Sequence, residues 1–200
     1  MARSAKSDPI RNFKFQVTIN ATGSNLANMT TGLSRIGFAA MSGLSVQNEM
    51  VGYREGGMNT HPHKFIGQSD FAPVTFSRGV FENQSQMYKW QQFLHSWNQA
   101  SQGSTSQDND YRCDILVKVY DHPVSTGAYN TPGSVESNNL QLGNARFGFK
   151  LFNCWPGAYS LSDLNAGDSG IIVQQLTVHH EGFVVGWTPQ EVERLASLGG

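Results

Sequence analysis

The stretch CDILVKVYD, residues 113–121, decides the fold class because apolar and polar side chains alternate along it. Alternation with a period of two residues is the pattern of a β-strand that has one buried face. The stretch NFKFQVTIN, residues 12–20, alternates in the same way. The apolar face of the first stretch consists of Cys113, Ile115, Val117 and Val119. Both stretches are therefore predicted to be half-buried strands of a mainly β protein.

Further strand-like stretches are separated by polar turns that contain glycine. Residues 71–81, 146–155 and 170–183 have the composition of strands. Residues 38–51 are interpreted as one more strand, which is broken by Gly43. The number of such stretches again favours a mainly β protein.

One flanking α-helix is predicted at about residues 83–99. Asn83 or Ser85 is predicted to cap its start. Its large apolar side chains recur at i, i+3, i+4 and i+7, which is one face of a helix, and they are Trp90, Phe93, Leu94 and Trp97. Such an aromatic stripe packs on a sheet more often than it lines a ligand cavity, so we assign it to the core.

The C-terminal segment carries the start signal of a second, short helix. Thr188 is a predicted N-cap, Pro189 follows it, and Glu191 is the capping-box partner three residues after Thr188. The alternative for this segment is a frayed tail.

Length and composition predict one domain over residues 1–200, with an inserted loop or hairpin at about 121–144. Hydrophobic residues make up 38% of the chain, which is enough for a core.

The net charge of −1 argues against the basic surface with which proteins bind nucleic acid. We find no membrane-span pattern and expect a protein made in the cytoplasm. A charged fraction of only 14% tolerates self-association.

The two cysteines, Cys113 and Cys154, lie in or beside strand-like stretches. A buried free thiol is favoured over a disulfide in a reducing compartment. Both cysteines are therefore predicted to be structural.

The search for catalytic patterns favours a protein that is not an enzyme and has no cofactor. The sequence contains no G-x-S-x-G, Walker, G-x-G-x-x-G or H-E-x-x-H pattern. His61 and His63 are two apart in an extended segment and could share a metal, but the closest acidic candidate, Asp70, is seven residues further on. A metal-dependent enzyme built on this histidine pair remains a remote alternative.

The remaining polar candidates have simpler structural interpretations. His179, His180 and Glu181 are consecutive, so their side chains alternate in direction along a strand, and we expect partly buried, hydrogen-bonded histidines. Asp163, Asp168 and Glu181 are candidates for paired carboxylates, but the segment LSDLNAGDSG is typical of a turn.

Several segments match, in order, those of a known family. The most specific are DPIRNFKF (8–15), SGL (42–44), YREGG (53–57), FSRGV (76–80) and VHHEGF (178–183). On these segments the chain resembles the tail tube proteins of contractile phages and of related extracellular injection systems. The chain departs from the family pattern at residues 20–37 and 121–144, which look expanded, so loop contacts there do not carry over.

The resemblance implies a β-sandwich or barrel of two sheets with one flanking helix and long loops. It also implies a structural subunit: six copies form a ring, and rings stack into a hollow tube inside a contractile sheath. Edge strands with unpaired backbone groups suit a subunit that closes a ring. The tube of an injection system that delivers protein effectors is the alternative, and nothing in the sequence separates the two.

The resemblance further implies partners and a location. The partners are other copies of the chain, the sheath protein, the tape measure protein, and the baseplate and tail terminator proteins. DNA is expected to pass through the lumen without specific binding. The location is the virion tail, assembled in the host cytoplasm.

A subunit contact is predicted around the stretch VGYREGGMNTHPHKFIG, residues 51–67. This stretch has almost no buried-strand pattern and is interpreted as a loop that reaches a neighbouring copy. Gly56 and Gly57 supply freedom for a tight turn, and the alternative is a solvated Arg-Glu pair that contributes little. The predicted contact residues are Tyr53, Arg54, Glu55, Gly56, Gly57 and Arg78.

Overall fold

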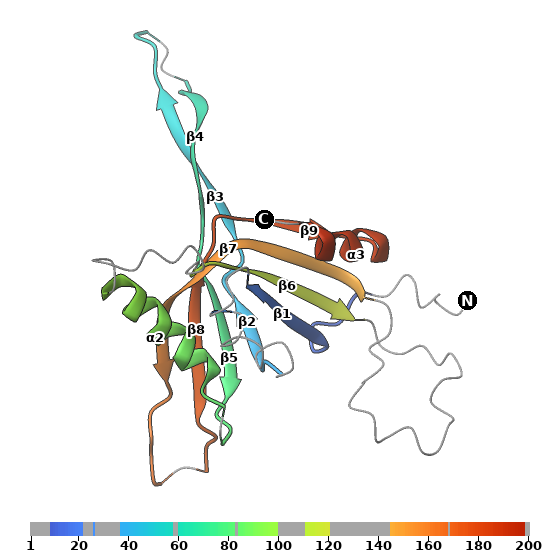
Figure 1. Ribbon diagram of the computed structural model, residues 1–200. Helices are drawn as coiled ribbons and strands as arrows, with labels where there is room; N and C mark the ends of the chain where they lie inside the picture. Colours follow the sequence, from blue (N-terminus) through green and yellow to red (C-terminus); the bar gives the residue numbers. More distant parts are fainter. Residues whose placement is uncertain are drawn as a thin grey trace.

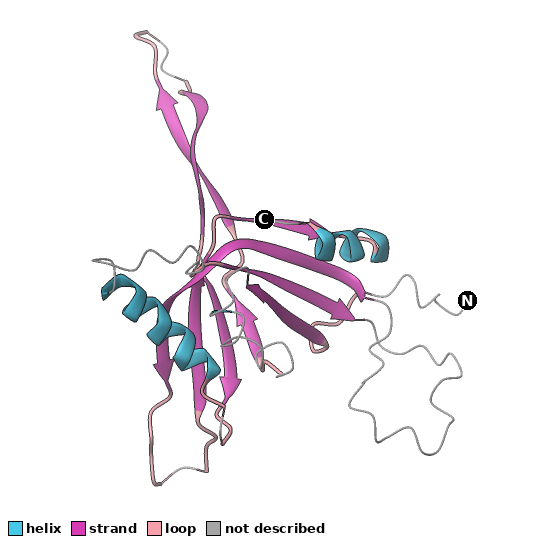
Figure 2. Ribbon diagram, viewed as in Figure 1, coloured by secondary structure: helices cyan, strands magenta, loops and turns pink. Residues whose placement is uncertain are grey.

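The computed structural model describes residues 9–21, 26, 37–57, 60–82, 84–99, 111–120, 145–167 and 169–198. Within these residues strands dominate, and two helices flank them (Figures 1 and 2). The mainly β prediction is therefore confirmed. The elements are β1 (Phe15–Ala21), β2 (Ala40–Ser42), β3 (Val46–Tyr53), β4 (His63–Phe71), β5 (Val74–Gly79), α2 (Gln86–Gln99), β6 (Cys113–Tyr120), β7 (Ala145–Leu161), β8 (Val173–His179), β9 (Gly182–Gly186) and α3 (Pro189–Ser197).

A seven-stranded antiparallel sheet forms the body of the described chain. Its order is β1-β6-β7-β8-β5-β2, and β9 pairs with the first half of β7. The 17-residue strand β7 joins two halves of this sheet, because its first part pairs with β6 and β9 and its last part pairs with β8. Asn153, between the two parts, has a φ of 52°, a left-handed conformation that asparagine tolerates. The two halves face each other as the expected sandwich.

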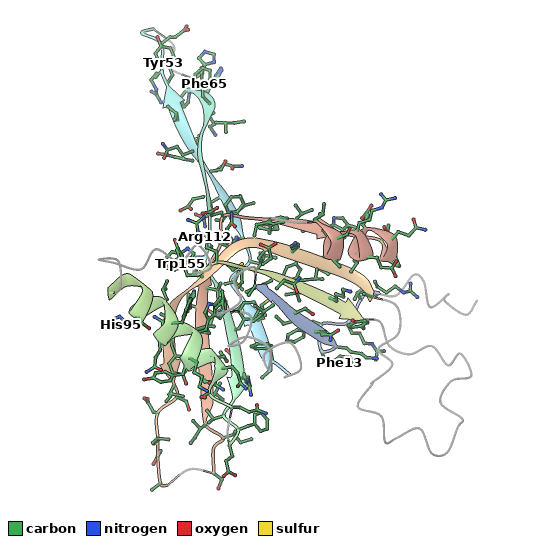
Figure 3. All side chains as sticks on the ribbon, in the orientation of Figure 1. Phe13, Tyr53, Phe65, His95, Arg112 and Trp155 are labelled. Atoms are coloured by element: carbon green, nitrogen blue, oxygen red, sulfur yellow. The ribbon has the colours of Figure 1, made fainter. Side chains whose placement is uncertain are left out.

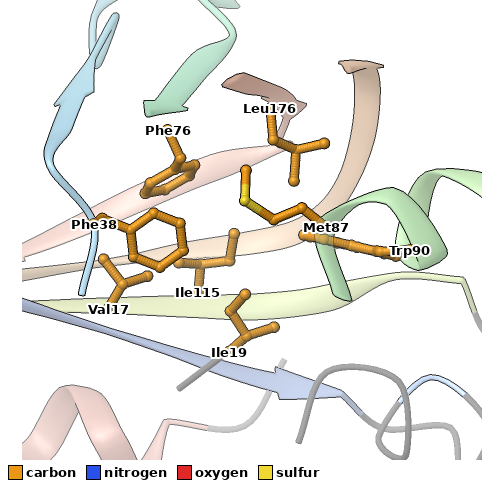
Figure 4. Close-up of a pocket in the computed structure, with 8 residues that line it drawn as sticks. All are labelled: Val17, Ile19, Phe38, Phe76, Met87, Trp90, Ile115 and Leu176. Carbon is orange, nitrogen blue, oxygen red and sulfur yellow. The ribbon is translucent and has the colours of Figure 1, made fainter. Parts of the chain in front are cut away.

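The core lies between the two halves of the sheet and beneath α2. Val17, Ile115 and Leu151 belong to one half, whereas Phe76 and Leu176 belong to the other, and all are buried in one cluster. A small apolar cavity remains among these side chains (Figure 4), and its lining consists of Val17, Ile19, Phe38, Phe76, Met87, Trp90, Ile115 and Leu176.

Helix α2 confirms the core assignment of the aromatic stripe where the structure describes it. Trp90 is buried, and Phe93 packs against the same cluster. Met87, which the sequence interpretation did not single out, is also buried. The helix begins at Gln86 rather than near residue 83. The side chain of Trp97 and the proposed cap Asn83 lie outside the described residues.

Helix α3 confirms the predicted capping box. The Thr188 hydroxyl accepts a hydrogen bond from the Glu191 backbone N–H, and the Glu191 carboxylate accepts from the Thr188 N–H. The helix packs closely on Gly148 of β7 and Gly186 of β9, which are register partners. A Cβ atom on either glycine would lie 3.0 Å from an atom of Val192. Side chains at both positions would push the helix away from the sheet.

The structure corrects three strand predictions. Residues 38–51 form two strands in different sheets, since β2 joins the body while β3 pairs with β4. Residues 51–67 are not a plain loop, because they contain the end of β3 and the start of β4. Strand β9 was not anticipated as a separate element. The expanded segment 121–144 lies outside the described residues.

The cysteine prediction is confirmed. Cys113 and Cys154 are register partners on β6 and β7, both are buried, and neither is in a disulfide bond. Burial raises the pKa of the Cys154 thiol far above its usual value, with the nearby Asp114 carboxylate as a second cause. A thiol held protonated in this way is a poor nucleophile, which supports a structural role.

Candidate assembly surface

Strands β3 and β4 form a two-stranded ribbon that projects from the body of the protein (Figure 1). We call residues 46–71 the arm. Every β3 side chain is exposed. An isolated two-stranded hairpin is marginally stable in water, and it normally needs another surface to cover it.

Large apolar side chains cover both faces of the arm. Val51 lies opposite Phe65, and Met50 lies opposite Ile66 one step along, so the two pairs occupy opposite faces. Ile66 is 87% exposed. Contiguous exposed apolar residues of this kind mark an interaction surface.

The tip of the arm carries the residues predicted to contact a neighbouring copy. Tyr53 ends β3, opposite His63 at the start of β4, and Tyr53 and Phe65 are seen near the far end of the ribbon (Figure 3). Arg54, Glu55, Gly56 and Gly57 follow and are exposed. Gly57 has a φ of 97°, a conformation that only glycine adopts without strain. The turn role expected of Gly57 is therefore confirmed, whereas the subunit contact stays a prediction.

The base of the arm is anchored on the β8–β9 turn. The Phe71 ring lies 5.7 Å from the His180 ring and 5.9 Å from the Phe183 ring. His180 Nε2 is 3.1 Å from the Ala72 carbonyl oxygen, and the Ala72 N–H donates to the Ser45 carbonyl. His180 is thus buried and hydrogen-bonded, as expected. These contacts tie both strands of the arm to the body.

The remaining histidine and carboxylate candidates do not form a reaction site among the described residues. The His61 and His63 rings are 6.0 Å apart, and no group of three potential metal ligands occurs in the described part of the chain. His179 stacks on Trp155 at 4.6 Å. Glu181 pairs with Arg112 at 2.8 Å. Asp163 lies in the connection between β7 and β8, before the turn at residues 166–167, and Asp168 is outside the described residues.

Arg78 does not lie with the other predicted contact residues. It is on β5, whose inner row is Val74, Phe76 and Arg78, and its side chain is 0% exposed. In Figure 1 this end of β5 points away from the arm. Arg78 therefore offers no accessible surface in the isolated subunit and lies apart from the arm tip, and its place at a subunit contact stays a prediction. Arg78 follows Val74 and Phe76 at intervals of two residues, which places all three on one face of a strand. This spacing was the sequence signal for burial.

A second exposed apolar surface lies beside Arg78. We call Val80, Phe81, Ile171 and Ile172 the distal patch, and all four are exposed. The Val80 N–H donates to the Ile172 carbonyl, which joins its two segments. Sequence reasoning missed this patch, although the short apolar runs GVF and GII that flank the strands were a signal.

Four strand segments of the seven-stranded sheet carry free edges among the described residues. They are β1, β2, β9 and the last part of β7. Unpaired backbone groups on such edges are available to another chain.

Neither α2 nor α3 has the length and hydropathy that a membrane crossing requires.

The chain is similar to a known protein family and to several solved structures. The family model for the T4-like virus tail tube protein gp19 matches residues 11–184. No curated protein sequence matches the chain.

Solved structures with the same fold are distant in sequence. The anti-feeding prophage cap is 19% identical, with a TM-score of 0.62 over 94% of this chain and 95% of that chain. A chain of the extended sheath–tube complex of the PVC extracellular contractile injection system is 18% identical. Its TM-score is 0.61, and the match covers 92% of this chain and 95% of that chain. The anti-feeding prophage baseplate is 18% identical, with a TM-score of 0.63 over 90% and 97%. At these identities the structures support the fold.

Proposed function

Because the chain belongs to the T4-like virus tail tube protein gp19 family, we propose that six copies form a ring and that rings stack into a hollow tube. The tube lies inside a contractile sheath and conducts genomic DNA into a host cell. The function is geometric: the subunit catalyses no reaction and needs no cofactor. The particle is a virion tail, assembled in the host cytoplasm.

The observation that carries this proposal is the arm, together with the family match. A ribbon with Val51 and Phe65 on one face and Met50 and Ile66 on the other buries neither face on its own chain. Covering both faces requires neighbours, and a closed ring stacked on identical rings supplies them through heterologous contacts. Tyr53, Arg54 and Glu55 at the tip then lie at a contact between copies.

The partners follow from the same assembly. The sheath protein surrounds the tube, the baseplate and terminator proteins close its ends, and a tape measure protein occupies it before DNA does. The solved relatives come from a sheath–tube complex, a baseplate and a cap, which supports such partners for this chain. The net charge of −1 suits a lumen through which DNA slides, because few basic side chains remain to hold phosphates.

A second candidate function is the tube of a contractile injection system that delivers protein effectors. It is favoured by the anti-feeding prophage and PVC structures among the fold relatives. The nucleic acid content of purified particles separates the two functions. Particles with a capsid and packaged DNA support the phage tail, whereas particles without DNA support the injection system.

Electron microscopy of the purified chain tests the proposal. We expect tubes with sixfold symmetry at high protein concentration. Arg54→Glu should impair tube formation while the circular dichroism spectrum and unfolding midpoint stay unchanged. Lys89→Glu, a charge reversal on the exposed side of α2 and off the arm, is the matched control. A monodisperse monomer at every concentration, in the presence of tube-capping and sheath partners as well, would contradict the assembly.

A further inference from the structure

The distal end of the sandwich holds a buried cation that has no counter-charge among the described residues. Arg78 is 0% exposed, and its Nε and Nη1 groups have no hydrogen-bond partner among the described residues. Nη2 donates to the Gln84 side chain, and the guanidinium lies 5.6 Å from the centre of the Phe81 ring. Burial lowers the pKa of Arg78, yet a guanidinium stays protonated. An unpaired buried charge is costly, so this arrangement calls for a partner.

The described polar side chains next to Arg78, Gln84 and Gln174, are neutral. Gln174 of β8 is the register partner of Arg78 and is itself buried. Its amide oxygen is 3.3 Å from the Tyr159 hydroxyl, and its amide nitrogen is 3.5 Å from the Gly79 carbonyl oxygen. These neighbours are engaged with one another and supply no negative charge.

Within the distal patch, the Phe81 ring contacts the Arg78 guanidinium, and Phe81 and Ile171 lie together next to Gly79. Carbon atoms of Phe81 and Ile171 both lie 3.9 Å from the position that a Cβ on Gly79 would occupy. Phe81 is 58% exposed and Ile171 is 81% exposed. A shift of the Phe81 side chain would open Arg78 to a ligand that arrives across an apolar surface.

The complementary group is on the arm. Its tip has an exposed carboxylate, Glu55, next to the exposed aromatic residue Tyr53, and no ion pair of Glu55 occurs within the described chain. The arm and the distal patch lie at opposite ends of the subunit (Figure 1). Copies stacked head to tail would therefore bring the arm tip of one copy to the distal patch of the next.

We propose that the distal patch is the receptor for the arm tip of a second copy of this chain, with the Glu55 carboxylate as the counter-charge of Arg78. This pairing rests on the proposed tube function and adds to it the residues that recognise each other. Tyr53 packs against Phe81 and Ile171, and the carboxylate accepts hydrogen bonds from the unpartnered Nε and Nη1. A subunit alone carries the cost of the unpaired cation, and assembly removes it.

The proposal predicts opposite effects of one substitution on folding and on assembly. Arg78→Met removes a buried unpaired charge while keeping an unbranched side chain, so the isolated subunit should unfold at an equal or higher denaturant concentration. The protein concentration needed for tube formation should rise by about tenfold or more, as expected for the loss of a desolvated charge pair. Glu55→Gln should raise it to a similar extent, and the double variant should be no worse than either single variant.

Matched variants identify the partner carboxylate. Glu193→Gln, on the exposed side of α3 and off the arm, should assemble as the wild type does. Glu82 and Asp163 are carboxylates near the patch in the same chain, and loss of assembly on Glu82→Gln or Asp163→Asn but not on Glu55→Gln would overturn the proposal. Normal tubes from Arg78→Met would also overturn it, and would leave the tube function intact. A wild-type chain that never forms tubes would overturn both.

Cross-linking tests the contact without changing Arg78. Gly56 and Gly52 both face open space, so cysteine fits at either position. Tubes of Gly56→Cys/Phe81→Cys treated with diamide should yield a ladder of disulfide-linked multimers on a non-reducing gel. Gly52→Cys/Phe81→Cys, with the first thiol on the shaft, is the control. Equal ladders from both variants, or none from the first in intact tubes, would count against docking of the tip.

Discussion

Lys150 and Asp114 form a nearly buried ion pair beneath the C-terminal helix, with 2.9 Å between Nζ and Oδ2. The Lys150 side chain is 3% exposed, donates also to the Leu198 carbonyl at the end of α3, and lies over the Phe152 ring. A cation at the C-terminal end of a helix is favoured by the helix dipole. This lysine therefore couples the β6–β7 sheet to the position of α3.

Removal of Asp114 should destabilise the subunit more than removal of Lys150. Asp114→Asn leaves an ammonium group buried without a counter-charge, which should cost about 3 kcal/mol of unfolding free energy. Lys150→Met leaves a carboxylate that is more exposed and still accepts from the Asn153 N–H at 3.3 Å. Urea unfolding measures both changes.

The exposed pair Arg112–Glu181 provides the control for this comparison. Arg112→Gln should change the unfolding free energy by about 1 kcal/mol or less, because that pair is open to solvent. An Asp114→Asn variant no less stable than Lys150→Met would show that the buried pair does not hold α3.

A side chain at Gly186 should loosen α3. Gly186→Ala places a methyl group 3.0 Å from the Val192 backbone nitrogen and 3.2 Å from the Leu195 side chain. Overpacking of this kind costs about 1–3 kcal/mol, and limited proteolysis should cut near α3 sooner. Gly52→Ala, where a Cβ meets open space, should leave both stability and proteolysis unchanged. Equal cleavage rates for the two variants would argue against close packing of the helix.

Loss of one apolar side chain from the arm should impair assembly without affecting folding. Ile66→Ser removes an exposed side chain, so the unfolding free energy should stay within about 0.5 kcal/mol of the wild type. The tube-forming concentration should rise by tenfold or more if that face is covered by another copy, because burial of such a side chain is worth about 1.5–3 kcal/mol. Sedimentation of tubes measures the change. Phe13→Ser, which removes an exposed apolar side chain that lies off the arm, is the control, and unimpaired Ile66→Ser tubes would contradict burial of the arm.

Alkaline pH should weaken the subunit partly through Tyr120. Burial raises the pKa of its phenol above 10.0, and its hydroxyl donates to the Gln16 side chain at 2.8 Å. The folded state therefore holds this proton more tightly than the unfolded state, and the associated stability is present below pH 10 and is lost as pH rises through the folded pKa. Tyr120→Phe should reduce the fall in unfolding free energy above pH 10. An unchanged slope would mean that Tyr120 does not ionise in that range.

Local sequence patterns determined most of the elements. The alternation in residues 113–121 and 12–20 predicted β6 and β1, because the two-residue period is a property of the extended chain itself. Thr188 and Glu191 predicted the start of α3, since both capping hydrogen bonds lie within four residues. The aromatic stripe predicted the buried face of α2, because the 3.6-residue period of a helix is also a local property of the chain.

The surfaces were decided by long-range pairing, which no local pattern contains. Residues 51–67 look like a loop because they lack a buried face, but they pair as a ribbon whose apolar side chains no other described strand covers. Strand β7 changes partners at Asn153, so its length depended on β8 and β9 being in place. The composition of 51–67 was therefore enough to predict an exposed contact segment. Only the tertiary structure showed that this segment and Arg78 lie far apart. The distance between the arm and the end of β5 depends on strand order.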